Sequence, residues 1–163
     1  MSKGFTLIEL LVVISIIGIL SSIGIVSYST ILKNSRDARR QSDIKAIQSA
    51  LEQYRADHSF YPTSLNLSSL ATIDSNSGNP NPQTNNINVY LNNTPVEPSL
   101  NSSYPYLYSA LPANCNNIGT KCSSYCIYAK LENSVSKASQ CSDKPFTCNA
   151  NSSNCYTLKA TIP

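Results

Sequence analysis

An apolar run near the N-terminus is the feature that most constrains this chain. From Leu10 to Val26 every residue is apolar or small, and Glu9 is the one charged residue between Gly4 and Leu32. A helix of about 20 such residues is long enough to span the hydrocarbon core of a bilayer. A cleaved secretory signal fits poorly, because the run is too long and no small-x-small cleavage site follows it. We therefore expect a membrane-spanning helix.

The carboxylate of Glu9 has two explanations. A charge inside an apolar membrane helix costs about 2.5–3.5 kcal/mol on insertion scales, so such a residue is usually paired. Alternatively, Glu9 lies close enough to the helix start to reach water at the interface. Small residues within the run would let neighbouring helices approach closely, although they are also ordinary in membrane helices. These small residues are Ser15, Gly18, Ser21, Ser22 and Gly24.

The segment KGFTLIEL at residues 3–10 resembles the processing site of type IV prepilins, the precursors of type IV pilins and type II secretion pseudopilins. The resemblance implies that a membrane peptidase cuts between Gly4 and Phe5 and then methylates the new N-terminus at Phe5. It also implies that Glu9 pairs with the N-terminal amine of a neighbouring subunit. Breaking a buried ion pair costs about 3–5 kcal/mol, so this pairing would fix the axial offset between subunits.

A second helical half is predicted after the apolar run. No proline or further glycine interrupts the chain from Ile25 to Phe60. Apolar side chains recur at helical spacing, which defines one buried face. Pro62 disfavours helical angles at the residue before it, so we expect the helix to end near Asp57. Residues 51–63 also resemble the helix end and first loop of pseudopilins. The apolar face consists of Ile44, Ile47, Leu51 and Tyr54.

The remaining chain predicts an α+β fold, in which the amphipathic second half of the helix packs on a small C-terminal antiparallel sheet. Alternating patterns predict strands over 104–110, 125–131 and 156–162, and a short helix is expected over 64–73. We divide the chain into a leader (1–4), a transmembrane and assembly helix (5–32) and a soluble head (33–163). Within the head we expect helix to about 57, a loop region over 58–103 and the sheet over 104–163.

Six cysteines lie in the last third of the chain, and their even number in a loop-rich segment favours disulfides that tie the loops together. The spacing leaves their connectivity open. Zinc is the rival, but the gaps are wide and no histidine is near. Some pseudopilins bind calcium in a C-terminal loop, yet Asp143 stands alone there, so we expect no metal and no cofactor. The candidates are Cys115, Cys122, Cys126, Cys141, Cys148 and Cys155.

A basic cluster follows the apolar run, although the net charge is only +3. The favoured role for it is a solvated helix face or a contact with lipid headgroups. The alternatives are salt bridges between subunits and DNA binding, and the small number of charges argues against DNA binding. The positive-inside rule would hold the cluster in the cytoplasm. The cysteines and the prepilin resemblance instead favour a cytoplasmic N-terminus and an external C-terminus. The cluster comprises Lys33, Arg36, Arg39, Arg40 and Lys45.

An enzyme is not expected. His58 is the one histidine and has no partner acid or cysteine in sequence, and no phosphate-binding loop or metal motif occurs. The leading hypothesis is a structural subunit of a type IV pilus. The alternatives are a type II secretion pseudopilin and a minor tip pilin acting as adhesin or DNA receptor. Expected partners are other pilins in a helical filament, the prepilin peptidase and methyltransferase, an inner-membrane assembly platform, and the bilayer before assembly. The filament would be an extracellular pilus or a periplasmic pseudopilus.

Overall fold

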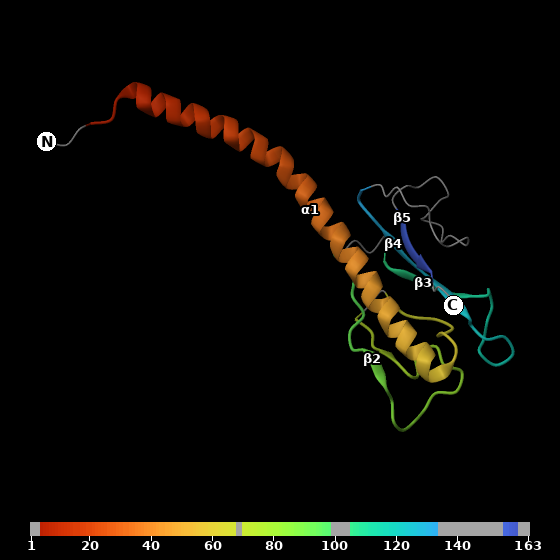
Figure 1. Ribbon diagram of the computed structural model, residues 1–163. Coiled ribbons are helices and arrows are strands. Elements are labelled where there is room, and N and C mark those ends of the chain that lie inside the picture. The colour runs from red at the N-terminus through yellow and green to blue at the C-terminus, as the bar shows by residue number, and fades with distance from the viewer. Residues whose placement is uncertain (1–3, 68–69, 99–104, 134–154, 160–163) are drawn as a thin grey trace. The chain divides into compact units, whose positions relative to one another are not determined.

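The computed structural model describes residues 4–67, 70–98, 105–133 and 155–159, without the side chains of 23–27 and 155–159. Its elements follow the order α1, β1, β2, β3, β4, β5 (Figure 1). The chain divides into two compact units, residues 1–35 and 36–163. The class is α+β, as the sequence predicts, with an N-terminal helix followed by two small antiparallel sheets. The sequence predicts the C-terminal sheet but not the sheet of β1 and β2, which lies in the expected loop region.

Helix α1 (Leu7–His58) is continuous and ends within one residue of the position expected from the sequence. Its C-terminus has a local cause beyond Pro62. Ser59 adopts the left-handed backbone region at φ 62°, and its N–H donates to the Arg55 carbonyl at 2.7 Å. A left-handed residue directly after the last turn is a common way to satisfy the final carbonyls of a helix.

In the N-terminal unit the apolar side chains of α1 are exposed. Those from Leu7 to Leu20 have exposed fractions of 49–80 %. The predicted membrane span is not confirmed, because no helix among the described residues is both long and apolar enough to cross a bilayer.

The second unit has its core between α1 and a three-stranded sheet. The predicted apolar face of α1 is confirmed, since Ile44, Ile47, Leu51 and Tyr54 are all fully buried. The first three of these belong to one cluster with Tyr125, Ile127 and Ala129 of the sheet. Burial of this stripe against the sheet explains why the second half of the helix is amphipathic.

The three strands of this sheet are β3 (Leu107–Leu111), β4 (Ser124–Lys130) and β5 (Cys155–Lys159), in the antiparallel order β3-β4-β5 (Figure 1). They lie within three residues of the predicted strands, although Tyr104 falls outside the described residues. Strand β4 is central and buried on both faces. One face joins the helix cluster, and the other packs Cys126 and Tyr128 against side chains of β3.

The short helix predicted over 64–73 is wrong. Its described residues form no helix, and its end contributes strand β1 (Ile73–Asp74), which pairs with β2 (Val89–Leu91). The backbone groups of Ala71 form hydrogen bonds with Thr94 in a later loop and not with neighbours in their own segment. Thr94 both donates its N–H to the Ala71 carbonyl at 2.7 Å and accepts the Ala71 N–H on its hydroxyl at 3.0 Å. These cross-links replace the bonds that a helix would have supplied.

Candidate functional site

The bond between Gly4 and Phe5 lies outside regular structure, because α1 begins only at Leu7. The Phe5 side chain is 86 % exposed. A Cβ built on Gly4 would meet no atom within 4 Å, so none of the residues that the structure describes requires glycine there. The segment therefore offers an accessible, non-helical peptide bond of the kind that a peptidase can approach closely.

Glu9 takes part in a capping box at the start of α1. Its Oε2 accepts the Thr6 N–H at 2.8 Å and the Thr6 hydroxyl at 2.7 Å, while its own N–H donates to Thr6 Oγ1 at 3.3 Å. This reciprocal arrangement satisfies backbone donors that the first helical turn leaves unpaired. Thr6 is thus a functional residue that was not predicted, although Thr-x-x-Glu before an apolar run is the sequence signature of this cap.

Glu9 also lines an open hollow of about 340 Å³ beside the helix start. Its other lining side chains, Phe5, Ile8, Val12 and Val13, are all apolar. An acidic residue therefore lies beside an apolar surface. Such an arrangement suits a cation that arrives together with apolar groups.

Two serine hydroxyls within the apolar half of α1 are satisfied by the helix itself. Ser15 Oγ donates to the Leu11 carbonyl at 2.8 Å, and Ser22 Oγ donates to the Ile19 carbonyl at 2.7 Å. Serine can therefore supply a small side chain there without presenting an unpaired donor to apolar surroundings. Gly18 likewise has no atom within 4 Å of the place where a Cβ would lie.

The basic cluster is only partly the solvated helix face favoured by its sequence. Arg40 is 3 % exposed and donates from Nη1 to Asp37 at 2.6 Å and to Glu132 at 3.1 Å. Its Nε donates to Glu97 at 2.9 Å, and its Nη2 also contacts Glu97. Arg36 holds both Glu132 oxygens at 2.5 Å. Two members of the cluster therefore pair within their own subunit, whereas Lys33, Arg39 and Lys45 are exposed.

Asp37 connects this network to the end of the sheet. Its carboxylate accepts the backbone N–H groups of Glu132 and Asn133, each at 2.9 Å, and the Asn133 amide at 2.8 Å. Burial alone would raise the pKa of Asp37, but these hydrogen bonds outweigh it and hold that pKa below its ordinary value. The hydrogen bonds from Arg36 lower the pKa of Glu132 to about 2, against the opposing effect of burial.

Three further carboxylates of α1 accept phenol hydroxyls from elsewhere in the head. Asp43 accepts Tyr106 at 2.8 Å, Asp57 accepts Tyr90 at 2.7 Å, and Glu52 accepts Tyr61 at 3.0 Å and Tyr125 at 3.1 Å. Tyr106 belongs to the main core cluster, and Tyr108 packs against it. Burial followed by the bond to Asp43 raises the pKa of Tyr106.

His58 packs at the C-terminal end of α1. Its ring stacks on Tyr54 at a centroid distance of 4.3 Å, and its Nδ1 lies 3.0 Å from the Tyr54 carbonyl. No three histidine, cysteine, aspartate or glutamate side chains gather into a metal site in the part of the chain that the structure describes. The Cys115 and Cys122 side chains form a disulfide, with Cα atoms 5.1 Å apart.

Cys126 is also disulfide-bonded. Cys141, Cys148 and the side chain of Cys155 fall outside the described residues, so their predicted pairing stays a prediction. The observed Cys115–Cys122 disulfide lies within the loop between β3 and β4. The sequence leaves the pairing of these cysteines open.

Comparison with known families gives two matches along the chain. Residues 1–25 match the prokaryotic N-terminal methylation motif, and residues 28–118 match type II secretion system protein G. No solved structure matches the chain.

Individual relatives extend this similarity. The type II secretion system core protein G of Pseudomonas aeruginosa is 38 % identical over 110 residues, which cover 67 % of this chain and 74 % of the relative. The core protein G of Vibrio cholerae is 37 % identical over 65 % of this chain and 70 % of its own length. That of Klebsiella michiganensis is 42 % identical over 38 % of this chain and 44 % of its own.

Proposed function

Because this chain belongs to the type II secretion system protein G family, we propose that it is cut after Gly4, methylated at Phe5 and polymerised through α1 into a periplasmic pseudopilus. The family is one of structural pseudopilin subunits, not of enzymes. The comparisons therefore agree with the secretion pseudopilin that the sequence offered as an alternative. The type IV pilin that it preferred is a related subunit.

The observation that carries this proposal is the arrangement at the start of α1. An exposed Gly4–Phe5 bond precedes a helix whose first turn holds Glu9 beside an open apolar hollow. Cleavage creates a cationic amine on Phe5 at the tip of an apolar helix. The amine of one subunit and the Glu9 carboxylate of the next then offer opposite charges in apolar surroundings, where leaving either one unpaired costs about 3–5 kcal/mol.

Membrane insertion precedes assembly in this proposal, with the N-terminus in the cytoplasm and the head outside. The sequence run from Leu10 to Val26 supports it, as do the serine hydroxyls that bond to their own helix. The prepilin peptidase and an inner-membrane assembly platform are the further partners that processing and polymerisation would require.

Processing is tested by mass spectrometry of the mature N-terminus after the full chain is expressed with a prepilin peptidase. We expect the N-terminal residue to be Phe5 carrying one methyl group. Gly4→Ala should block cleavage. Because a Cβ at Gly4 meets no atom of the described residues within 4 Å, the block would arise from the fit of this residue in the peptidase and not from the fold of the chain. Gly18→Ala is the matched control, since its Cβ also meets nothing, and it should be processed normally. A mature N-terminus at any other residue would refute the processing step.

Pairing is tested with Glu9→Gln, which removes the charge and keeps the cap. Glutamine serves in a capping box as glutamate does, whereas only a carboxylate attracts an amine by charge. We expect the variant to be processed but to yield far fewer sheared filaments than wild type. Thr6→Ala is the complementary control, because it removes the cap and keeps the charge. Wild-type filament yield from Glu9→Gln would show that capping, not pairing, is the role of Glu9.

A further inference from the structure

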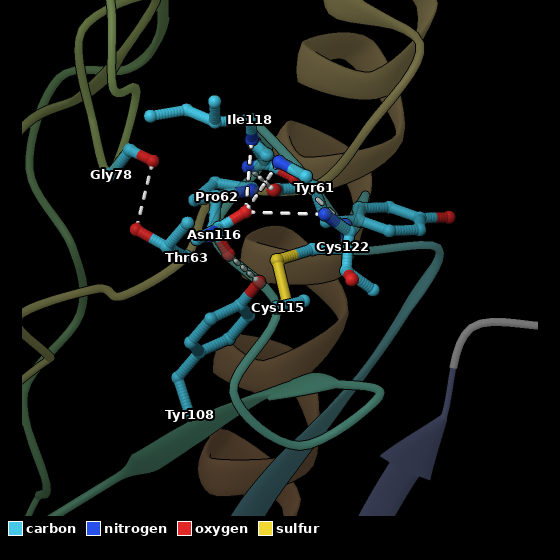
Figure 2. Close-up of a disulfide and its surroundings, with 12 residues drawn as sticks. Tyr61, Pro62, Thr63, Gly78, Tyr108, Cys115, Asn116, Ile118 and Cys122 are labelled. Carbon is cyan, nitrogen blue, oxygen red and sulfur yellow. Dashed lines mark hydrogen bonds between the residues drawn. A yellow bond between two sulfur atoms is a disulfide. The ribbon is translucent and has the colours of Figure 1, made fainter.

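The chain that follows α1 is held from three sides at residues 61–63, which we call the linker. From β3, the Tyr108 hydroxyl donates to the Pro62 carbonyl at 2.7 Å (Figure 2). The Tyr61 N–H donates to the Cys122 carbonyl at 2.9 Å, and the Tyr61 carbonyl accepts the Asn117 amide at 2.8 Å. On the third side, the Thr63 N–H and hydroxyl both donate to the Gly78 carbonyl, at 3.1 and 2.9 Å (Figure 2). The loop 115–122 therefore supplies both hydrogen bonds to the Tyr61 backbone, whereas the Tyr61 hydroxyl bonds to Glu52 on α1. A separate turn supplies the bonds to Thr63.

The Cys115–Cys122 bond closes this loop. Cys122 is fully buried in the main core cluster, and Cys115 is half-buried against it. By contrast, Ile118 at the tip is 77 % exposed and contributes nothing to the core. A loop with this composition has little apolar burial apart from its two sulfur-bearing ends, so the covalent bond limits the conformations that it can adopt.

Two asparagine side chains arrange the interior of the loop, together with the backbone N–H groups of the same residues, which both donate to the Thr120 carbonyl at 3.0 Å. The Asn116 Oδ1 accepts the backbone N–H groups of Ile118, Gly119 and Thr120 at 3.0, 2.9 and 3.2 Å. The Asn117 Oδ1 accepts the Cys122 N–H at 2.7 Å, while the Asn117 amide reaches Tyr61. Asn117 thus bonds to the linker and to the residue that carries the second sulfur, so its position depends on where Cys122 is held.

We propose that the Cys115–Cys122 disulfide is a redox-dependent lock on the linker, closed by exchange with a disulfide oxidant that reaches the Cys115 sulfur. The half-buried Cys115 is the accessible sulfur, because Cys122 is fully buried. The Cys115 thiolate attacks one sulfur of the oxidant disulfide and releases the other as a thiolate. Cys122 then attacks the mixed disulfide at Cys115, so that the oxidant leaves as a dithiol and each cysteine has lost one proton and one electron.

The consequence for the subunit is that the linker is fixed to the loop only in an oxidising compartment. Reduction opens the loop and removes both hydrogen bonds to the Tyr61 backbone. The Thr63 bonds to Gly78 and the Tyr108 bond to Pro62 do not depend on the loop. The linker joins the long helix to the rest of the head, so the lock acts on how firmly these parts are joined. This role does not depend on cleavage after Gly4 or on pairing by Glu9.

Graded reduction of the purified full chain with dithiothreitol tests the proposal. In each sample, alkylation of Cys115 and Cys122 and amide hydrogen exchange are followed by mass spectrometry. We expect Tyr61 exchange to rise about tenfold or more, in step with the fraction of molecules alkylated at Cys115, while Thr63 exchange changes by less than about twofold. Full alkylation of both cysteines with Tyr61 still protected would overturn the lock.

The Cys115→Ser/Cys122→Ser double variant separates this bond from that of Cys126. Tyr61 should exchange fast in this variant without reductant, and added dithiothreitol should change it no further. Cys126→Ser is the matched control, because it leaves the Cys115–Cys122 bond in place, and it should keep Tyr61 protected. If Cys126→Ser releases Tyr61 as strongly as the double variant does, the proposed lock is wrong.

Discussion

At the scale of single residues, Arg40 has the most concentrated role in the head. It lies on α1, yet its guanidinium contacts a carboxylate one turn away and two others far along the chain. Burial of a cation is costly unless carboxylates pair with it. Here Asp37, Glu97 and Glu132 pair with Arg40, and Glu132 also pairs with Arg36. The network is therefore more sensitive to loss of one member than to uniform replacement by apolar groups.

Replacement of Arg40 by alanine should lower the free energy of unfolding of the head by about 3–5 kcal/mol, because Asp37 and Glu97 would remain buried without their cation. Arg39→Ala is the matched control, since the neighbouring side chain is exposed, and it should change that free energy by less than about 0.5 kcal/mol. Urea unfolding followed by far-ultraviolet circular dichroism measures both values. Equal losses in the two variants would contradict the network.

The acid response of the head should depend on Glu132. Its pKa is lowered from 4.5 to about 2, so its contribution to stability is present above pH 4.5 and is lost as the pH falls towards 2. We expect wild type to be more stable than Glu132→Gln at pH 6, and the difference to shrink progressively below pH 4.5. Urea unfolding at several pH values measures it. A difference that stays constant down to pH 2 would show that the carboxylate charge is not the cause.

At the scale of elements, the turn that holds Thr63 depends on a glycine. Gly78 has φ +57°, and a Cβ there would lie 2.7 Å from both the Thr63 nitrogen and the Ser64 oxygen. Both are backbone atoms, so neither can rotate aside as a side chain can. The turn and the linker thus approach each other at a distance that only glycine permits.

Gly78→Ala should destabilise the head by about 1–3 kcal/mol, combining left-handed strain with the close backbone contact. Gly119→Ala should cost less than about 0.5 kcal/mol, because its Cβ would find its nearest atom at 3.9 Å. Thermal unfolding of the two variants side by side provides the comparison. The order of the two effects is the decisive result, and a more harmful change at Gly119 would refute the close approach.

The elements also show what a single sequence can predict. The helix, its buried stripe and the three C-terminal strands are predictable because each is long enough to show its own period. Strands β1 and β2 are too short for that, and they arise from pairing within a turn-rich region. Two of the three carboxylate partners of Arg40 lie 57 and 92 residues away, so no local pattern could predict them. Thr6 is different, because its capping pattern is visible in the sequence.

At the scale of the whole molecule, the two compact units should differ in their ability to fold alone. The main core cluster lies entirely between Ile44 and Ala129, and the ion pairs begin at Arg36. By contrast, the apolar side chains from Leu7 to Leu20 are exposed. The head thus contains its own core, whereas the N-terminal half of α1 presents a surface suited to other helices or to lipid.

A chain of residues 33–163 should therefore fold alone and unfold cooperatively in urea, with its Cys115–Cys122 bond intact. It should form no filaments, because it lacks Phe5 and Glu9. Analytical ultracentrifugation and disulfide mapping by mass spectrometry check these outcomes. A broad, non-cooperative transition would show that the N-terminal unit is needed for the head to fold.

The carboxylates along α1 make the length of one part of the helix unalterable. Asp37, Asp43, Glu52 and Asp57 each meet a donor fixed elsewhere in the head. A residue inserted into the helix rotates the part of the helix beyond it by about 100° and shifts that part by about 1.5 Å, so some of these hydrogen bonds must break. An alanine inserted after Ala46 should therefore abolish cooperative unfolding of the 33–163 chain, whereas one inserted after Asn34 keeps every spacing and should be tolerated. Natural variation in helix length can thus accumulate before Arg36 but not between Asp37 and Asp57.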